Sequence, residues 1–416
     1  MSTAEEALRL RPGQVELVWH DPQGPYGKKH RGPYRYRAFV PARLADVDVV
    51  IPASLAAALE DAARAVSELN RSESANLEAV AAPLLRSESV ASSRIENLRV
   101  SHRRVAEAIV DPHHAPAAAW EVANNVAAMR KAISLADQDV DRETIRAVHR
   151  SLLAGTRDEE HAGVERSAQS WIGGQSPRDA LYVPPPPELV GPLLDDLVAF
   201  TNRDDLPMIG HAALVHAQFE GIHPFVDGNG RTGRCLVHAV LHRRGLAPRL
   251  VPPISAALLT DRDGYYAVLA QFQQQGNPLP LLRTFADATE RACRHAAELI
   301  ATLEDRQGEW SRSANHPRSG SVGRRLIESL PAQPVLTAEI AAETLGVDPN
   351  VARRGLKALE VAGVVRLVPG RQRDRVWIAD DVFDVLDEFE GSIARDAGSR
   401  RLVAPTRHLR PPASSP

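Results

Sequence analysis

The sequence is poor in cysteine: its 416 residues include two, Cys235 and Cys293, far apart and in no metal-ligand spacing. A disulfide framework and a cysteine-ligated zinc site are therefore not expected. The low cysteine content instead predicts a reducing, cytoplasmic compartment. No apolar run approaches the roughly 20 residues that span a bilayer. The N-terminal residues 1–10 carry acids and no long apolar run, so neither a membrane span nor a signal peptide is expected.

Neither sign of charge dominates the chain. The formal net charge is −3 at pH 7, and 44% hydrophobic with 25% charged residues is typical of a soluble globular protein. The net charge of the whole chain therefore does not indicate nucleic-acid binding, although a local basic patch stays an alternative. The chain also lacks a Walker-type phosphate loop, a paired-His zinc motif and a Gly-x-Ser-x-Gly elbow. Its length predicts two or three domains.

The most informative stretch is 223–234, which reads HPFVDGNGRTGR. Mostly apolar runs at 208–219 and 235–241 predict that it is a loop between two helices. Gly228 and Gly230 allow the backbone to approach a ligand closely. If the second helix starts there, its free N–H groups favour an anion. Arg231 and Arg234 are three residues apart, so both can reach phosphate oxygens from the first helical turn.

The same loop contains groups suited to metal and proton chemistry. Asp227 offers hard oxygen ligands for Mg²⁺, which commonly shares its coordination with substrate phosphates. His223 has a side-chain pKa that is naturally close to neutrality, as a general base requires. With Asn229 and the loop amides available to stabilise developing charge, the residues predict nucleophilic attack on phosphorus at a metal-bound polyphosphate.

Helical periodicity begins near Pro52 and recurs along most of the chain, so a mostly α fold is predicted. The pattern changes in 169–183, where two short β-like segments around a Gly/Ser/Pro turn predict a small β-hairpin. After 308–320, a helix-turn-helix followed by a basic hairpin predicts a winged helix. Further helices are expected at 77–85, 103–109, 117–135, 142–153, 189–201, 208–221, 235–244, 263–275 and 281–303.

The segment 89–97 combines a polar helix face with a residue that can end a helix. Ser92 and Glu96 are four residues apart and share a helix face, and Asn97 can end a helix in the left-handed conformation. By itself this is an ordinary polar helix end.

The run from His223 to Arg234 resembles the complete Fic-family motif, His-Pro-Phe-x-Asp-Gly-Asn-Gly-Arg-x-x-Arg, with no departure at a defining position. The resemblance extends to the helical N-terminal region, the predicted hairpin, the lead-in 216–222 and the winged helix. It implies a protein adenylyltransferase, a nucleotidyltransferase that moves AMP from ATP to a Ser, Thr or Tyr hydroxyl and releases pyrophosphate. ATP is then the substrate, and Mg²⁺ the metal.

The resemblance also implies residue roles. His223 would be the general base and Asp227 the Mg²⁺ ligand, and the hairpin would be a flap that aligns the target's extended segment by strand addition. Phosphate contacts would come from Gly228, Asn229, Gly230, Arg231 and Arg234. The flap residues would be Gln169, Trp171, Ile172, Gly173, Leu181, Tyr182 and Val183.

With the family in view, the segment from Ser92 to Asn97 resembles the inhibitory motif [Ser/Thr]-x-x-x-Glu-[Gly/Asn] that some Fic proteins carry before the core. The resemblance implies that Glu96 pairs with Arg234. A carboxylate there removes a γ-phosphate partner and adds negative charge where that phosphate should lie.

The expected organisation is a helical Fic core with a hairpin flap and a C-terminal winged helix-turn-helix domain. The divisions are an arm (1–50), a region with the inhibitory helix (51–110), the catalytic core (111–307), a linker (308–320), the winged helix (321–390) and a disordered tail (391–416). In the arm, the basic cluster 28–31 is expected to be solvated, with a phosphate-binding patch as the alternative.

Several alternatives stay open. Some Fic relatives transfer UMP, phosphocholine or phosphate, and some remove AMP. A different class is a DNA-binding regulator with the Fic core as nucleotide sensor, although winged helices often bind proteins. Target proteins, the chain itself, DNA and a second copy in a homodimer are the candidate partners. The basic residues of the winged helix are Arg353, Arg354, Lys357, Arg371, Arg373 and Arg375.

Overall fold

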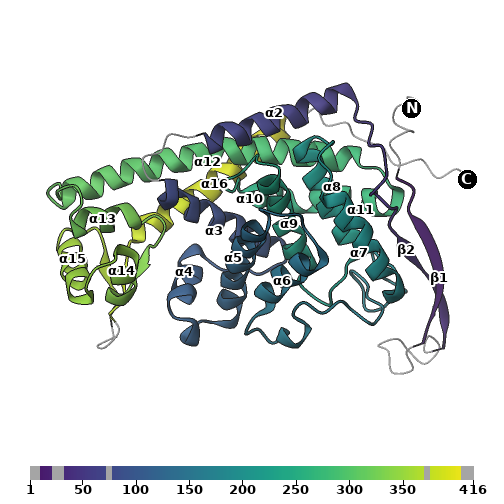
Figure 1. Ribbon diagram of the computed structural model, residues 1–416, viewed down its shortest axis with the longest axis horizontal. Coiled ribbons are helices and arrows are strands. Elements are labelled where there is room, and N and C mark those ends of the chain that lie inside the picture. The colour runs from purple at the N-terminus through teal and green to yellow at the C-terminus, as the bar shows by residue number, and fades with distance from the viewer. Residues whose placement is uncertain (1–9, 21–31, 72–76, 370–374, 404–416) are drawn as a thin grey trace, which may run out of the picture.

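The computed structural model describes residues 10–20, 32–71, 77–369 and 375–403. Most of them are helical, as predicted, and two small antiparallel sheets complete this part of the chain. The helices, labelled as in Figure 1, are α2 (Ala53–Asn70), α3 (Leu77–Ile95), α4 (His102–Val110), α5 (Ala117–Leu135), α6 (Arg142–Leu153), α7 (Pro187–Thr201), α8 (Met208–Ile222), α9 (Asn229–Arg243), α10 (Ile254–Leu259), α11 (Arg262–Gln275), α12 (Leu279–Ser313), α13 (Val322–Ser329), α14 (Ala338–Leu345), α15 (Pro349–Val361) and α16 (Asp380–Val403), with short 3₁₀ turns at Pro112–His114 and Glu159–His161. The strands are β1 (Gly13–Trp19), β2 (Tyr34–Val40), β3 (Val335–Leu336), β4 (Arg366–Leu367) and β5 (Trp377–Ile378).

Helix α8 occupies the centre of the core. Every residue from Ile209 to Ile222 is buried. A helix with no face exposed to solvent must be surrounded by other elements. Helices α7, α9 and α12 pack against it. Because α9 is also largely buried, the loop that joins α8 to α9 starts and ends inside the core. Figure 1 shows α12 running along the molecule with α2 beside it.

An antiparallel hairpin, β1–β2, forms within the region that the sequence analysis expected to be an arm. The hairpin itself was not predicted, because it depends on aromatic partners elsewhere in the fold. Trp19 packs edge-on against Trp171 with ring centroids 5.2 Å apart. Phe39 stacks on Tyr182 at 5.4 Å. The basic cluster 28–31 lies outside the described residues.

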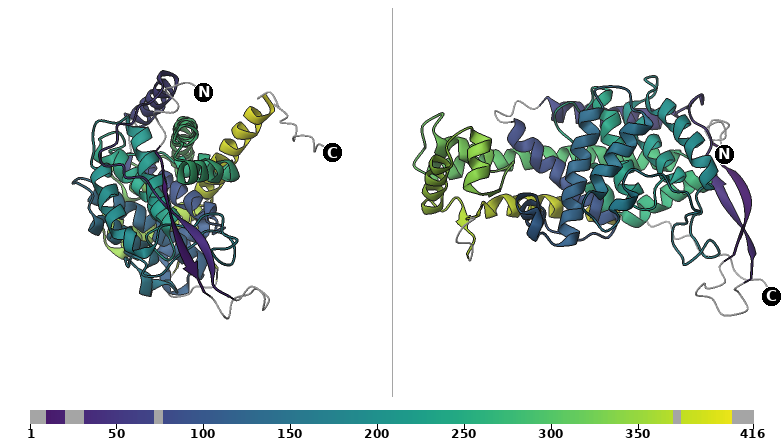
Figure 2. Two further views of the ribbon diagram at one scale, coloured as in Figure 1. Left: turned by 90° about the vertical axis from the view of Figure 1, so that its right-hand side faces the viewer. Right: turned by 60° about the horizontal axis from the view of Figure 1, so that its bottom comes forward.

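The C-terminal unit contains α13, α14 and α15 with a three-stranded antiparallel sheet in the order β3-β5-β4. These elements lie where the sequence predicted a winged helix, and the assignment to that fold stays a prediction. Figure 2 shows the unit at the end of the molecule opposite the β1–β2 hairpin. The predicted turn between β4 and β5 includes Arg371 and Arg373, which lie outside the described residues.

Helix α16 returns from the C-terminal unit and packs against α12 and α4. Its Glu390 pairs with Arg94 on α3 and lies 2.7 Å from His102 Nε2. Asp380, at its start, pairs with Arg103 on α4 and with Arg366 on β4. The C-terminal unit is therefore tied by ion pairs to the region around residues 94–103.

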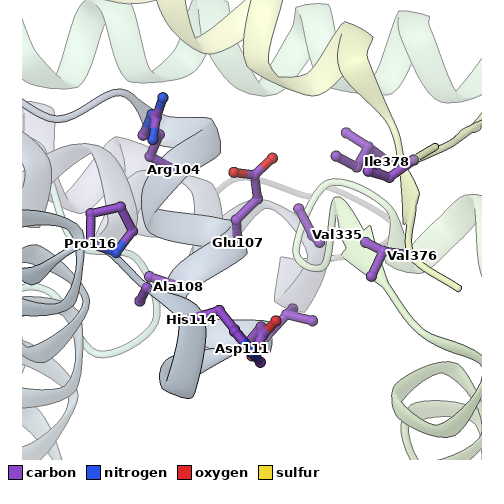
Figure 3. A pocket seen from close by; sticks show the side chains of 12 residues that line it. Arg104, Glu107, Ala108, Asp111, His114, Pro116, Val335, Val376 and Ile378 are labelled. Carbon is purple, nitrogen blue, oxygen red and sulfur yellow. The ribbon is translucent and has the colours of Figure 1, made fainter. Parts of the chain in front are cut away.

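A cavity of about 260 Å³ remains between α4 and the C-terminal sheet. Glu107 and Arg104 line one side, and Val335, Val376 and Ile378 line the other (Figure 3). None of its lining residues belongs to the loop 223–228, so this cavity is separate from the predicted site.

Two predicted boundaries were wrong. Helix α12 continues to Ser313, into the predicted linker 308–320, because Trp310 is buried and its Nε1–H donates to Asp381 at 3.1 Å. Helix α16 continues to Val403, into the predicted disordered tail, and buries Ile393.

Both cysteines are buried, and burial raises the pKa of each thiol to about 12. Among the described residues, no helix combines the length and apolar character needed to cross a membrane.

Three buried histidines make the fold sensitive to acid. Burial lowers the pKa of His149, His211 and His216 from 6.5 to about 4. Between these two values the unfolded chain binds more protons than the folded protein. The contribution of these histidines to the free energy of unfolding is therefore fully present above pH 6.5, and it is lost as the pH falls toward 4.

We expect His211→Gln to flatten this dependence. The wild-type free energy of unfolding should fall between pH 6.5 and 4, and the variant should lose about 3 kcal/mol less across that range. Urea unfolding at a series of pH values measures both curves. His113→Gln, at an exposed position, is the control and should keep the wild-type curve. An unchanged pH dependence in His211→Gln would contradict the assignment.

Candidate functional site

The loop between α8 and α9 is held mainly by its own backbone and by Asn229. His223 ends α8 in the left-handed conformation, with φ 50° and ψ 60°. Gly228, with φ 75°, precedes α9 and allows the chain to enter the helix. Asn229 accepts a hydrogen bond from the Phe225 N–H and donates one to the Phe225 carbonyl, both at 2.9 Å. Because both ends of its amide bond to the Phe225 backbone, Asn229 braces the loop, and its second amide N–H is not used by these two bonds.

His223 lies beside a buried carboxylate. Its Nδ1 is 3.6 Å from Glu220 Oε2, and its side chain is 16% exposed. Burial alone would raise the pKa of Glu220, but the neighbouring His223 ring and the charge of Arg234 outweigh it and hold that pKa below its ordinary value. A carboxylate next to Nδ1 favours a proton on that nitrogen, which leaves Nε2 as the basic atom of the ring.

Arg166 anchors the carbonyl side of the same loop, a role that the sequence analysis missed. Its Nε–H donates to the His223 carbonyl at 2.8 Å, and its NH2 group donates to the Pro185 carbonyl at 2.6 Å. Its backbone N–H donates to the Pro224 carbonyl at 2.8 Å. Burial lowers the pKa of Arg166 to about 10. No sequence pattern marks such a residue, because its partners are backbone atoms of distant segments.

Asp227 and Arg231 form the outer part of the turn. Arg231 donates to Asp227 Oδ2 at 2.8 Å across one helical turn. The Asp227 side chain is 54% exposed, whereas Arg231 is buried. The Nε and NH1 groups of Arg231 are buried without a hydrogen-bond partner among the described residues. Unpaired buried guanidinium donors are costly, so they indicate a place for an anion.

Glu96 and Arg234 meet near the start of α9. Arg234 donates to Glu96 Oε1 at 2.7 Å, and to the hydroxyl and carbonyl of Ser92 at 2.8 and 2.9 Å. The predicted ion pair is therefore present. Burial alone would lower the pKa of Arg234, but Glu96 outweighs it and raises the pKa above its ordinary value. A Cβ added to Gly230 would lie 2.0 Å from Glu96 Oε1, so this carboxylate fills the space that the missing side chain leaves.

The segment that carries Glu96 is fixed at its end, as predicted. Asn97 adopts φ 66°, and its side-chain oxygen accepts a hydrogen bond from Arg262 at 2.5 Å. The Tyr266 hydroxyl donates to the Ile95 carbonyl at 3.0 Å. Burial, with Glu96 nearby, raises the pKa of Tyr266 to about 12. Helix α3 thus ends in a bonded cap that places Glu96 against Gly230.

The predicted hairpin in 169–183 is reduced to one antiparallel bridge, Ile172 with Tyr182. The Tyr182 hydroxyl donates to the Gly221 carbonyl at 2.9 Å, which ties the segment to the end of α8. On the far side, the Phe39 N–H of β2 donates to the Val183 carbonyl at 2.9 Å. Gln169 donates to the Pro184 carbonyl, Trp171 meets Trp19, Gly173 has φ 71°, and Leu181 is exposed.

His149 is a second residue that the sequence analysis missed. It lies on α6, its ring stacks on Phe225 at a centroid distance of 3.7 Å, and its Nε2 is 2.9 Å from the Asp227 carbonyl. The periodicity of α6 predicts that it is buried, but no local pattern connects it with a loop that follows far along the chain.

These groups fit a metal-bound polyphosphate. Oxygen ligands from Asp227, the unpaired donors of Arg231 and the N-terminal amides of α9 are the groups that bind Mg²⁺ and phosphate in proteins. Gly230 leaves a space that already holds a carboxylate, which is the kind of charge a phosphate would bring. A basic ring nitrogen of His223 at the same loop could accept a proton from an attacking hydroxyl.

Comparisons with known proteins agree with the motif. Residues 139–241 match the family described as Fic/DOC family, and residues 56–134 match the one described as Fic/DOC family N-terminal. The chain is 33% identical over 156 residues to "Protein adenylyltransferase Fic" of Drosophila yakuba and of Drosophila melanogaster, an alignment that covers 37% of this chain.

These alignments cover 28% and 29% of the two relatives, so the chain spans less than a third of their length. Among solved structures, "Fic-1 (aa134 - 508)" from C. elegans superimposes with a TM-score of 0.50 and 25% identity, over 60% of this chain and 74% of that one. The two matched family models and the unbroken motif in the loop show that this chain contains a Fic/DOC-family domain preceded by the N-terminal region of that family.

Proposed function

We propose that the chain is a protein adenylyltransferase, which transfers AMP from ATP to a Ser, Thr or Tyr hydroxyl of a target protein. The observation that carries this proposal is the anion-binding turn beside His223, where buried Arg231 retains two unpaired nitrogens. The printed name of the Drosophila relatives supports the same activity.

In the proposed reaction, His223 Nε2 accepts the proton of the attacking hydroxyl. The hydroxyl oxygen bonds to the α-phosphorus, the bond to the β-phosphate oxygen breaks, and pyrophosphate leaves. Arg231 and the first N–H groups of α9 hold phosphate oxygens. Asp227 would hold Mg²⁺, which supplies positive charge to the phosphates when it is bound. Glu220 keeps the Nδ1 proton of His223 in place, so that Nε2 stays free to accept one.

The segment 169–183 is the proposed docking edge for the target. Ile172 uses its N–H and C=O toward Tyr182 and Leu181, and the Val183 carbonyl is already occupied by β2. These bonds support the side of Trp171 and Gly173 as the edge where an extended segment would add. Hydrogen bonds from Tyr182 and Arg166 connect this edge with the backbone around His223.

Glu96 would inhibit the reaction. Its carboxylate lies at Gly230 and Arg234, where a terminal phosphate would need the guanidinium. Two negative groups cannot share this buried space favourably. ATP would therefore bind weakly, or with its α-phosphate out of line with the attacking hydroxyl.

Glu96→Gly should release the site. We expect transfer from α-labelled ATP, including self-modification, to rise on the order of ten- to a hundredfold, the usual range for a coupling of 1–3 kcal/mol. Labelling followed on gels measures the change, and unchanged labelling would contradict the inhibitory role.

His223→Ala in the Glu96→Gly background should lower labelling by about a hundredfold or more, because the base is removed. Persistent labelling would exclude His223 as the base. Chromatography of the products should show pyrophosphate. Release of ADP instead would favour phosphate transfer, and removal of AMP from a modified protein would favour the reverse reaction.

Helix α16, which follows the C-terminal unit, would hold Glu96 in place. Arg94 lies two residues before Glu96, and Glu390 of α16 pairs with it. Glu390 is largely buried, and although burial would raise its pKa, the bond with His102 and the charge of Arg94 hold the pKa below its ordinary value. A carboxylate so placed fixes the end of α3, and movement of α16 would loosen it.

Glu390→Gln should therefore raise labelling in the wild-type background severalfold and leave the rate of the Glu96→Gly variant unchanged. Glu388→Gln is the matched control, because Glu388 lies on the same helix and pairs with Arg395 at the surface. A rise of equal size in both backgrounds, or no rise in the wild type, would contradict the coupling.

DNA binding by the C-terminal unit is the second proposal that the sequence leaves. On α15, Arg354 and Lys357 are exposed, whereas Arg353 lies 3.5 Å from Glu339. A gel shift of duplex DNA with the full chain at rising salt tests it, and no shift at low salt would exclude it.

A further inference from the structure

His149 joins three segments that are distant in the sequence. Its Nδ1 accepts a hydrogen bond from the Gly163 N–H at 2.8 Å, and its Nε2 lies 2.9 Å from the Asp227 carbonyl. Its ring lies flat against Phe225, with an angle of 5° between the planes. The side chain is fully buried.

The backbone partners define the state of the ring. A backbone N–H can only donate, so Nδ1 carries a lone pair, and the Asp227 carbonyl can only accept, so Nε2 carries the hydrogen. The neutral ring satisfies both partners at once. Burial, which lowers the pKa of His149 to about 4, favours the same neutral form.

His149 also lies directly under the glycine of the turn. A Cβ on Gly228 would lie 2.9 Å from Leu152 Cδ2 and 3.3 Å from His149 Nε2. The Phe225 ring above it is held in turn by Asn229 through two backbone bonds. The peptide between Asp227 and Gly228 is therefore clamped from one side by α6.

We propose that His149 is a positioning residue for the phosphate-binding turn. By donating to the Asp227 carbonyl, it fixes the Asp227–Gly228 peptide and with it the direction of the Asp227 carboxylate and of the first N–H groups of α9. The inference rests on the proposed function, because it assigns His149 to the binding of the metal and phosphates of ATP.

Two variants separate the two hydrogen bonds of the ring. The amide of glutamine reaches about as far as Nε2, so His149→Gln keeps a donor for the Asp227 carbonyl. The amide of asparagine reaches about as far as Nδ1, so His149→Asn keeps only an acceptor for Gly163. Matched controls are His211→Gln and His211→Asn, since His211 is also buried, lies edge-on to Phe200 and bonds to its carbonyl at 2.9 Å.

All variants are made in the full chain with Glu96→Gly. The measurements are binding of a non-hydrolysable ATP analogue at rising Mg²⁺, the KM and kcat for AMP transfer, and the melting temperature. We expect His149→Asn to weaken analogue binding and raise the KM for ATP at least tenfold, and His149→Gln to stay within about threefold of the parent. Both His211 variants should lower the melting temperature without changing analogue binding.

Four results overturn or separate the claims. Parent-like binding by His149→Asn would overturn the positioning role. So would equal loss in both His149 variants that follows their melting temperatures, because that pattern indicates a structural role. If the parent binds the analogue but transfers no AMP, the proposed function fails. The comparison of analogue binding among the variants then still tests the role of His149. If the parent binds no analogue, both proposals fall.

Discussion

The ion pair between Glu96 and Arg234 is the constraint on which the arrangement of the site depends. It joins the end of α3 to the N-terminal part of α9, and its carboxylate lies in the space that Gly230 leaves open. Arg234 is buried, so without Glu96 or another anion its charge would lose the carboxylate that bonds to it directly. A terminal phosphate is the natural substitute for Glu96. Arg234 would thus stabilise either the inhibited site, by pairing with Glu96, or the site with ATP bound, by contacting its terminal phosphate.

The rest of the fold keeps the two sides of this pair in register. On the α9 side, Asn229 and Arg166 bind backbone atoms of the loop, and neither depends on a ligand to stay in place. On the α3 side, Asn97 and Tyr266 fix the last turn, and Glu390 of α16 pairs with Arg94. Because α16 follows the C-terminal unit and contacts the segment that carries Glu96, movement of α16 could bias the site.

Local patterns allowed much of this to be predicted. The motif marked the loop, and apolar periodicity marked α8 and α9. The segment from Ser92 to Asn97 gave the helix end with its left-handed cap, and the resemblance to the inhibitory motif implied the ion pair. The misses share a cause, since each depends on contacts between distant segments. Trp310 extends α12 because Asp381 meets it, and β1–β2 is ordered because Trp171 and Tyr182 receive its aromatic residues. The motif also could not show that the Asn229 amide bonds to the Phe225 backbone, and the expected contact of Asn229 with phosphate stays a prediction.

Binding of Mg·ATP to the wild type and to Glu96→Gly tests the central claim most directly. Isothermal titration with ATP, and with adenosine for comparison, separates the phosphate contacts from those of the nucleoside. If the Glu96 carboxylate occupies the phosphate position, Glu96→Gly binds ATP at least tenfold more tightly than the wild type, and adenosine binding is unchanged. Equal ATP affinity in the two proteins would contradict the claim that the Glu96 carboxylate occupies the phosphate position.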